Sequence, residues 1–212
     1  MGNYEDRKDY SKGSLDALPA SPEAWLQPWL EEARSADPED YNAMSLSTMG
    51  LDGHPDARIV LLRELVWEGG IPCLLFYTNY LSVKGRQLEA HPHAAVTFFW
   101  RELERQLRVR GRVERLSEAV SDRYFASRPR ESRIGAWASE QSAGLPDRAT
   151  LEQARADVES RFPGEVPRPP HWGGYRLNAA EIEFWQGRPG RLHDRVRYVH
   201  DGGAWKVDRL QP

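Results

Sequence analysis

The sequence predicts a mainly β protein of the α+β class, an antiparallel barrel with helical additions. Short runs with strand periodicity recur through the 212 residues, and most are joined by links of hairpin length. Asp52-Gly53 and Asp201-Gly202-Gly203 are typical turn sequences. No Gly-x-Gly-x-x-Gly motif follows a strand, and strands do not alternate regularly with helices, so a parallel dinucleotide-binding sheet is not indicated.

The clearest strand signal lies in the segment 105–116. Leu107, Val109 and Val113 alternate there with the arginines at 108, 110 and 112, which predicts one buried face and one basic face. Apolar content and turn signals place the remaining strands. These strands are expected at 43–49, 57–67, 71–79, 94–100, 174–177, 181–185, 195–200 and 204–209.

Helices are expected at four places. Ser21-Pro22 has the order of an N-cap and first turn, and an apolar stripe at helical spacing follows it, in which Pro28 should kink or split the helix. The other helices are expected at 82–90, 117–127 and 147–162. Residues 163–170 include four prolines, which predicts an extended linker.

Composition narrows the class of protein. There are 29 Lys and Arg residues against 32 Asp and Glu, so the chain has no global basic field and a nucleic-acid partner is not indicated. The six histidines lack zinc-site spacing, so no metal site is expected, and the single cysteine, Cys73, is expected to be a small buried hydrophobe. No apolar run of about 18 residues and no signal peptide are visible, so a cytoplasmic protein without membrane association is expected.

The segment Phe184–Arg195 carries the strongest chemical signal. Three arginines, His193 and Trp185 are grouped there around two glycines and a proline. Arginine supplies forked donors for phosphate, tryptophan a stacking face, and histidine a group that titrates near neutral pH. The combination predicts a pocket for a planar, anionic ligand.

Two further segments could hold phosphate. Arg58 and Arg63 bracket four aliphatic residues, and on one strand they would point to opposite faces, so the pair taken alone favours a buried strand with solvated ends. Residues 76–79 run into a helix start at Ser82-Val83-Lys84, where free backbone N–H groups and the lysine could bind an anion, although ordinary helix capping is an alternative.

Two polar groupings remain open. Gln106 could hydrogen-bond the edge of a heterocycle, or it could be a surface glutamine. Tyr124, Arg128 and Ser132 are spaced four apart and would share a helical face if the helix continued past Pro129. The three form a plausible phosphate-binding set, with a solvated helix end as the alternative.

Taken together, these residues resemble the pyridoxine/pyridoxamine 5′-phosphate oxidase family along nearly the whole chain. The matching motifs are Arg7-Lys-Asp-Tyr10, Arg58–Arg63, Phe76–Asn79, Glu104-Arg-Gln106, Ser127-Arg-Pro-Arg130, Ile134-Gly-Ala-Trp137, Gln141-Ser142, Trp172-Gly-Gly-Tyr175, Glu183-Phe-Trp-Gln-Gly187 and Arg191-Leu-His-Asp-Arg195. The resemblance implies an FMN-binding split β-barrel, a Greek-key-like antiparallel barrel that forms a homodimer with FMN at the interface.

The resemblance also implies roles for particular residues. The residues expected to contact FMN are Arg58, Ile59, Val60, Leu61, Tyr77, Thr78, Lys84, Gln106, Gln141, Ser142, Trp185 and Arg195. Those expected to contact the substrate are Arg63, Tyr124, Arg128, Ser132, Arg191, His193, Arg7 and Tyr10, with Arg191 and His193 also catalytic. Residues 1–20 would be a flexible segment and possible lid, and 21–212 one domain whose region from about 170 serves dimerisation and substrate binding.

The activity implied is oxidation of pyridoxamine or pyridoxine 5′-phosphate to pyridoxal 5′-phosphate, with hydride transfer to FMN and reoxidation by O2 to give H2O2. Two residues depart from the family pattern: Arg63 replaces the usual lysine, and Val83 replaces the usual arginine. The loss at 83 removes a charge-assisted hydrogen bond and would weaken FMN binding by about 10–100-fold if nothing compensates, although Lys84 and Arg58 remain. The alternatives are a related oxidase of the phenazine-biosynthesis type and a non-catalytic protein that binds FMN or pyridoxal phosphate.

Overall fold

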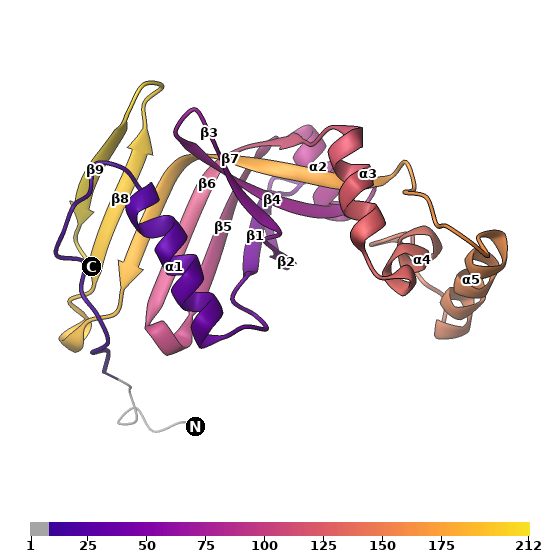
Figure 1. The fold of residues 1–212 in the computed structure, drawn as a ribbon, viewed down its shortest axis with the longest axis horizontal. Coiled ribbons are helices and arrows are strands. Elements are labelled where there is room, and N and C mark those ends of the chain that lie inside the picture. Colours follow the sequence, from indigo (N-terminus) through magenta and orange to yellow (C-terminus); the bar gives the residue numbers. More distant parts are fainter. Residues whose placement is uncertain (1–8) are drawn as a thin grey trace.

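One antiparallel sheet organises the chain. The structure is a computed structural model that describes residues 9–212, and nine strands are found in this range. They are β1 (Ala43–Met49), β2 (Pro55–Leu61), β3 (Glu64–Glu68), β4 (Ile71–Asn79), β5 (His93–Trp100), β6 (Arg105–Arg115), β7 (Trp172–Gln186), β8 (Asp194–His200) and β9 (Trp205–Leu210). The main order is β2-β1-β5-β6-β7-β4-β3, and β8 and β9 extend from β7 (Figure 1).

The expected strand 57–67 is in fact two strands. β2 pairs with β1, whereas β3 pairs with β4 at the opposite end of the sheet order. The chain turns between them: the Leu62 N–H donates to the Asn42 carbonyl and the Arg63 N–H donates to the Leu75 carbonyl, both at 2.8 Å. This break brings the two ends of the sheet order together and curls the sheet into a barrel. Arg58 therefore lies within β2, whereas Arg63 lies in the break between β2 and β3.

The expected strands 174–177 and 181–185 are one strand, β7. It pairs with β6 along one edge, and along the other edge with β4 through its first half and β8 through its second half. A register shift between Arg110 and Gly111 lets β6 follow this long partner. β7 therefore joins the barrel to the β8–β9 hairpin.

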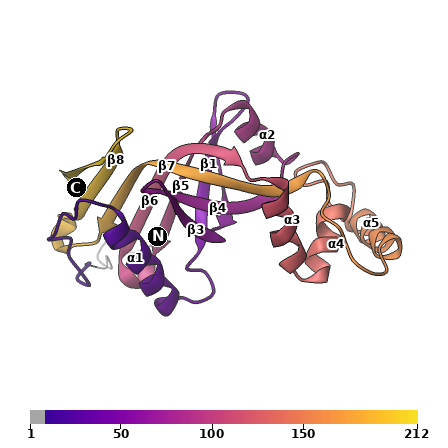
Figure 2. The same ribbon diagram turned by 45° about the horizontal axis from the view of Figure 1, so that its top comes forward.

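Five helices accompany the sheet in the described part of the chain: α1 (Glu23–Ala36), α2 (Val83–Ala90), α3 (Glu118–Ser127), α4 (Arg130–Ala138) and α5 (Arg148–Arg161). Side chains cap three of them, since Ser82, Ser117 and Asp147 accept from Gly85, Val120 and Thr150. Helices α3, α4 and α5 extend from one end of the sheet, opposite β8 and β9 (Figures 1 and 2).

Helix α1 continues through Pro28 without splitting. Its buried stripe outweighs the lost backbone hydrogen bond, because Trp29 packs edge-on to Phe184 at 5.0 Å and Trp25 does so at 5.4 Å. The core beneath it is formed by alternate residues of the strands, including Phe98, Leu107 and Tyr198, all fully buried. The alternation predicted for 105–116 is confirmed by the burial pattern of β6, and Cys73 is buried as expected.

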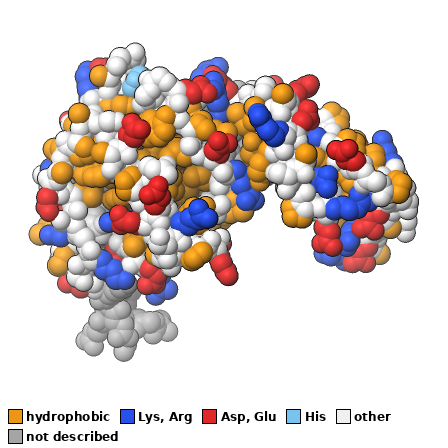
Figure 3. Space-filling model, in the orientation of Figure 1, with side chains coloured by type: hydrophobic (Ala, Val, Ile, Leu, Met, Phe, Trp, Pro, Cys, Tyr) orange, Lys and Arg blue, Asp and Glu red, His pale blue; other side chains and the backbone are white. Residues whose placement is uncertain are grey.

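The surface shows how charge is distributed. On the visible face, hydrophobic side chains gather over the central body, while acidic and basic side chains mix over the helical end (Figure 3). Helix α5 contributes the i,i+4 ion pairs Arg148–Glu152 and Arg155–Glu159. Within residues 9–212, no helix is long and apolar enough to cross a membrane, and no cluster of three His, Cys, Asp or Glu side chains is arranged for a metal ion.

A substitution at Gly111 tests how tightly β6 and β7 pack at their register shift. A Cβ at this position would overlap the carbonyl group of Asn178, so Gly111→Ala should destabilise the protein by about 1–3 kcal/mol. Gly164→Ala is the matched control, because a Cβ there meets no atom within 4 Å. Urea denaturation followed by tryptophan fluorescence measures both variants. Equal stability of the two would contradict this account of the bulge.

Candidate active site

A cavity of about 400 Å³ lies where β4 and β7 meet helices α3 and α4. It combines residues expected for the substrate with residues expected for the flavin. Its lining comprises Arg63, Tyr77, Thr78, Asn79, Tyr124, Arg128, Ser132, Gly135, Ala136, Ser139, Gln141 and Trp172. The structure thus brings together seven of the residues singled out from the sequence: Arg63, Tyr77, Thr78, Tyr124, Arg128, Ser132 and Gln141.

Tyr124, Arg128 and Ser132 reach this cavity without sharing one helix. Helix α3 ends at Ser127, the backbone is extended at Arg128, and α4 begins after Pro129. Proline disfavours helical backbone in the residue before it, so the chain turns at this point. The three side chains still face one space, because the turn between the two helices wraps around it.

The cavity has cationic and aromatic walls. Tyr77 and Tyr124 stack with ring centroids 3.7 Å apart, and Tyr77 also stacks with Trp172 at 5.7 Å. Burial, followed by the charge of Arg63, lowers the pKa of Arg128, while Tyr124 opposes the shift. One guanidinium nitrogen of Arg128, Nη1, is buried without a hydrogen-bond partner in the described part of the chain. Such a donor suits an anion that enters the cavity.

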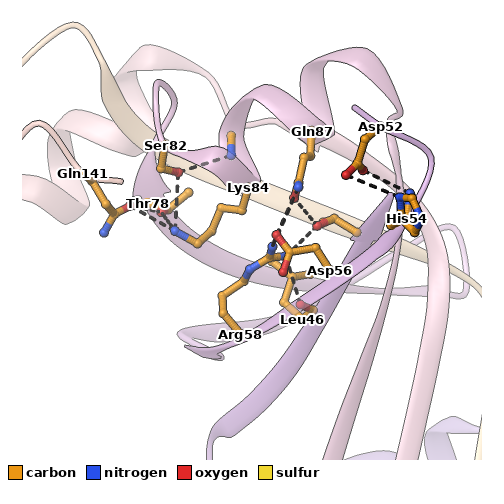
Figure 4. A network of polar contacts seen from close by, with 12 residues as sticks. Leu46, Asp52, His54, Asp56, Arg58, Thr78, Ser82, Lys84, Gln87 and Gln141 are labelled. Atoms are coloured by element: carbon orange, nitrogen blue, oxygen red, sulfur yellow. Dashed lines mark hydrogen bonds and ion pairs between the residues drawn. The ribbon is translucent and has the colours of Figure 1, made fainter. Parts of the chain in front are cut away.

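A second cationic cluster adjoins the cavity at the start of α2 (Figure 4). Lys84 Nζ donates to Gln141 at 3.0 Å and to the hydroxyl oxygens of Thr78 and Ser82 at 3.4 Å. Burial first, and then the positive charge of Arg58, lowers the pKa of Lys84. Two like charges held close together beside a helix N-terminus form a site that favours a bound anion.

The Arg58 side chain is fixed by four neighbours (Figure 4). It forms an ion pair with Asp56 at 2.6 Å and donates to Thr48 at 2.5 Å and to Gln87 at 3.1 Å. The Leu46 carbonyl accepts a further hydrogen bond at 3.2 Å. The guanidinium is therefore positioned before any ligand binds. Sequence reasoning missed Thr48, Asp56 and Gln87, because no pattern connects them before the strands and α2 are folded.

The neighbours of Arg58 on β2 differ from one another. Ile59 is exposed on the outside of the sheet, Val60 packs partly against the core, and Leu61 is half-buried. Val83 is half-buried in the first turn of α2 and supplies no donor there. Ser142 follows Gln141 on an exposed turn with a φ of +73°.

Gln106, Trp185 and Arg195 form a row across three strands. Gln106 on β6 faces Trp185 on β7, and Trp185 faces Arg195 on β8. Arg195 is oriented by Glu183, whose buried carboxylate accepts from its Nε at 2.9 Å and pairs with Arg108 at 3.1 Å. Side chains in one cross-strand row project from the same face of a sheet. The row therefore offers an aromatic face flanked by an amide and a guanidinium.

His193 lies beside this row. Its ring is 4.6 Å from Trp185, and its Nδ1 accepts a hydrogen bond from the backbone N–H of Arg188 at 3.1 Å. Burial, followed by the charge of Arg191, lowers the pKa of His193, which favours the neutral imidazole. Because Nδ1 accepts the Arg188 hydrogen bond, this neutral form carries its proton on Nε2. Arg191 is exposed and adopts a φ of +63° in the turn that begins at Pro189.

Asp9 and Tyr10 lie against the same place. The Tyr10 ring lies 5.6 Å from Trp185 and 5.7 Å from His193, and the Asp9 carboxylate accepts from the Gly190 N–H. Gly187 closely approaches the Tyr10 ring, and a Cβ there would overlap it. Arg7 lies outside the described residues.

The structure does not bring all the expected residues into one place. Trp172 lines the cavity, whereas Trp185 belongs to the row beside His193, and the 13 residue steps between them along β7 span roughly 40 Å. Helices α3 and α4, which border the cavity, and strand β8, which carries Arg195, lie toward opposite ends of the molecule in both ribbon views (Figures 1 and 2). Within one chain, Arg191 and His193 cannot contact a small ligand held by Arg63 and Arg128.

Comparison with known proteins identifies the family. Residues 30–162 match the family model described as pyridoxamine 5′-phosphate oxidase, and residues 172–212 match the C-terminal dimerisation region of pyridoxine 5′-phosphate oxidase. The pyridoxine/pyridoxamine 5′-phosphate oxidase of Burkholderia cenocepacia is 52% identical over 211 residues, covering 97% of each chain. That of Ralstonia pickettii is 53% identical over 209 residues, again covering 97% of each chain.

Solved structures show the same fold. PhzG from Burkholderia lata, in complex with tetrahydrophenazine-1-carboxylic acid, superposes with a TM-score of 0.84 at 33% identity and covers 94% of this chain and 100% of its own. An FMN-binding protein from Nostoc punctiforme superposes with a TM-score of 0.72 at 17% identity, a likeness of fold alone. The chain belongs to the pyridoxine/pyridoxamine 5′-phosphate oxidase family.

Proposed function

We propose that the protein oxidises pyridoxamine and pyridoxine 5′-phosphate to pyridoxal 5′-phosphate with FMN as cofactor and O2 as electron acceptor. The observation that carries this proposal is the cavity in which Arg63 and Arg128 stand beside the hydroxyl groups of Tyr124 and Ser132. Guanidinium and hydroxyl donors converging on one space suit a phosphate monoester. Arg63 keeps the charge of the lysine usual in the family, with a broader, planar donor group.

The residues present fit FMN. Arg58 and Lys84, at the N-terminus of α2, would hold its phosphate, and the row of Gln106, Trp185 and Arg195 would flank its ring. Bound FMN supplies the redox chemistry, which is acceptance of a hydride from C4′ of the substrate and reoxidation by O2 to give H2O2. The absence of a donor at Val83 leaves the phosphate with Arg58, Lys84 and the backbone N–H groups.

The active site requires two chains. One chain contributes Arg63, Arg128 and Lys84, and its partner contributes Trp185, Arg191 and His193, because β7 separates these two sets within a single chain. A two-fold symmetric dimer would form two such sites. This arrangement agrees with the match of residues 172–212 to the dimerisation region of the family.

Arg191 and His193 would orient the C4′ substituent and assist its proton loss. His193 presents Nε2–H, since its Nδ1 is engaged by the Arg188 N–H. A proton could reach Nδ1 only after that hydrogen bond opens, so the observed geometry favours an orienting role for His193. Tyr10 lies over this pair and would help to exclude water.

The likeness to PhzG supports a second candidate, oxidation of a tricyclic carboxylic acid. A carboxylate needs one guanidinium partner, whereas this cavity offers two guanidinium groups and two hydroxyl groups to an anion. The cavity therefore favours the phosphate ester.

The visible spectrum tests the proposed function. The purified protein loaded with FMN should lose its flavin absorbance when pyridoxamine 5′-phosphate is added without oxygen, and should regain it in air with release of H2O2. Unphosphorylated pyridoxamine should bleach the flavin far more slowly at the same concentration. A spectrum that does not respond to the phosphate ester but responds to a phenazine carboxylic acid would favour the second candidate.

Mixed dimers test the shared site. Arg128→Ala and Arg191→Ala should each reduce kcat/KM by about 100-fold or more, because each removes a charge-assisted contact from both sites. Co-expression of the two variants with different tags yields hybrid dimers in which one of the two sites is intact. The mixture should recover about a quarter of the wild-type rate, since half of its dimers are hybrids. No recovery in isolated hybrids would show that both arginines serve one chain.

The titration of Lys84 should make the affinity for FMN depend on pH. Its lowered pKa shows that the folded chain disfavours the charged form, whereas a bound phosphate favours it. Affinity should therefore be highest below the pKa of Lys84 in the free protein and fall by about tenfold as the pH rises through it. Quenching of flavin fluorescence measures the Kd from neutral to alkaline pH. Lys84→Arg stays charged and should abolish the decline; an identical decline in this variant would exclude Lys84 as the cause.

A further inference from the structure

Arg128 differs from four other largely buried arginines in what holds it. Arg58, Arg105, Arg168 and Arg195 each pair with a carboxylate at 2.6–2.9 Å. Among the residues that the structure describes, Arg128 forms no ion pair, and its Nη1 is buried without a hydrogen-bond partner. Its guanidinium lies instead over the Trp172 ring, 4.6 Å from the centroid, with Phe125 at 5.5 Å.

Trp172 is itself held firmly. It is the first residue of β7, it is 7% exposed, and its ring is nearly parallel to that of Tyr124, at an interplanar angle of 4°. It also stacks with Tyr77 and packs edge-on to Phe125 at 5.1 Å. The indole therefore presents a fixed face to the cavity that it lines.

We propose that Trp172 is a positioning residue for substrate phosphate, because its indole face holds the Arg128 guanidinium in place of a carboxylate. A carboxylate would bind the in-plane N–H groups and neutralise the charge. An aromatic face contacts the guanidinium from above, so the N–H donors and the full positive charge stay available to a phosphate. This inference rests on the proposed function, since it concerns the same cavity.

Burial of the Arg128 guanidinium makes its positive charge unfavourable in the absence of an anion. Desolvation lowers the pKa of Arg128, so holding the charged guanidinium there costs the folded chain free energy. A phosphate that enters the cavity offsets this cost, whereas an uncharged substrate does not. Trp172 thereby contributes to the preference for a phosphate ester without contacting the phosphate itself.

Trp172→Leu and Trp172→Phe test the proposal. Leucine removes the aromatic face, so KM for pyridoxamine 5′-phosphate should rise about tenfold while kcat changes little. KM for unphosphorylated pyridoxamine should stay close to that of the wild type. Phenylalanine restores a face and should bring KM for the phosphate ester back to within about threefold.

Phe98→Leu is the matched control, because Phe98 is fully buried in the core and does not line the cavity. It should lower the midpoint of thermal unfolding, as Trp172→Leu does, and leave KM unchanged. A Trp172→Leu variant that loses stability but keeps its KM would reduce Trp172 to a packing role and overturn the proposal.

Binding of inorganic phosphate, measured by calorimetry on the FMN-loaded protein, gives a readout that needs no turnover. Trp172→Leu should weaken this binding about tenfold, and Trp172→Phe should largely restore it. If the wild type binds phosphate in this way but fails to oxidise pyridoxamine 5′-phosphate, the proposed function fails and the role of Trp172 stands. If both proteins bind phosphate equally, the role of Trp172 fails whatever the reaction.

Discussion

The length and continuity of β7 set the distance between the two groups of candidate site residues. This strand begins inside the cavity at Trp172 and ends beside His193, and it pairs with β6, β4 and β8 along the way. A strand of 15 residues cannot fold back on itself, so the groups at its two ends are kept apart. A small ligand that needs both groups must take them from two chains. The strand therefore limits what one chain can place around a small ligand, and the proposed active site takes its second set of residues from a partner chain.

The arginines of the protein differ in whether a carboxylate neutralises them, and Arg58 and Arg195 keep a carboxylate partner although both are proposed to hold FMN. On the outer face of the sheet, Arg108 and Arg110 pair with Glu183 and Glu181, and these cross-strand pairs hold β6 to β7. In the cavity, Arg128 has an aromatic partner instead and retains its donors. Arg58 is intermediate, because Asp56 holds it while Lys84 beside it keeps the local charge positive. The same residue type thus serves folding in one place and recognition in another.

Much of the local structure could be predicted from the sequence. Alternation predicted the buried face of β6, and serine or aspartate caps placed α2, α3 and α5 within a residue or two. The errors arose where tertiary contacts override local pattern. The 57–67 segment is rich in Val, Ile and Leu, but its two halves pair with strands at opposite ends of the sheet order. Pro28 has no backbone N–H to donate within α1, yet the packing of Trp29 against Phe184 preserves the helix.

The sequence by itself determined the family, the antiparallel class and the residue types of the candidate site, because motifs, periodicity and caps are local properties of the chain. Tertiary structure alone decided which of those residues meet. It placed Tyr124, Arg128 and Ser132 around one cavity although two helices carry them, and it aligned Gln106, Trp185 and Arg195 across three strands. It also gave Trp172 its contact with Arg128. Strand register and barrel closure set these distances, and both depend on pairing between segments far apart in the chain.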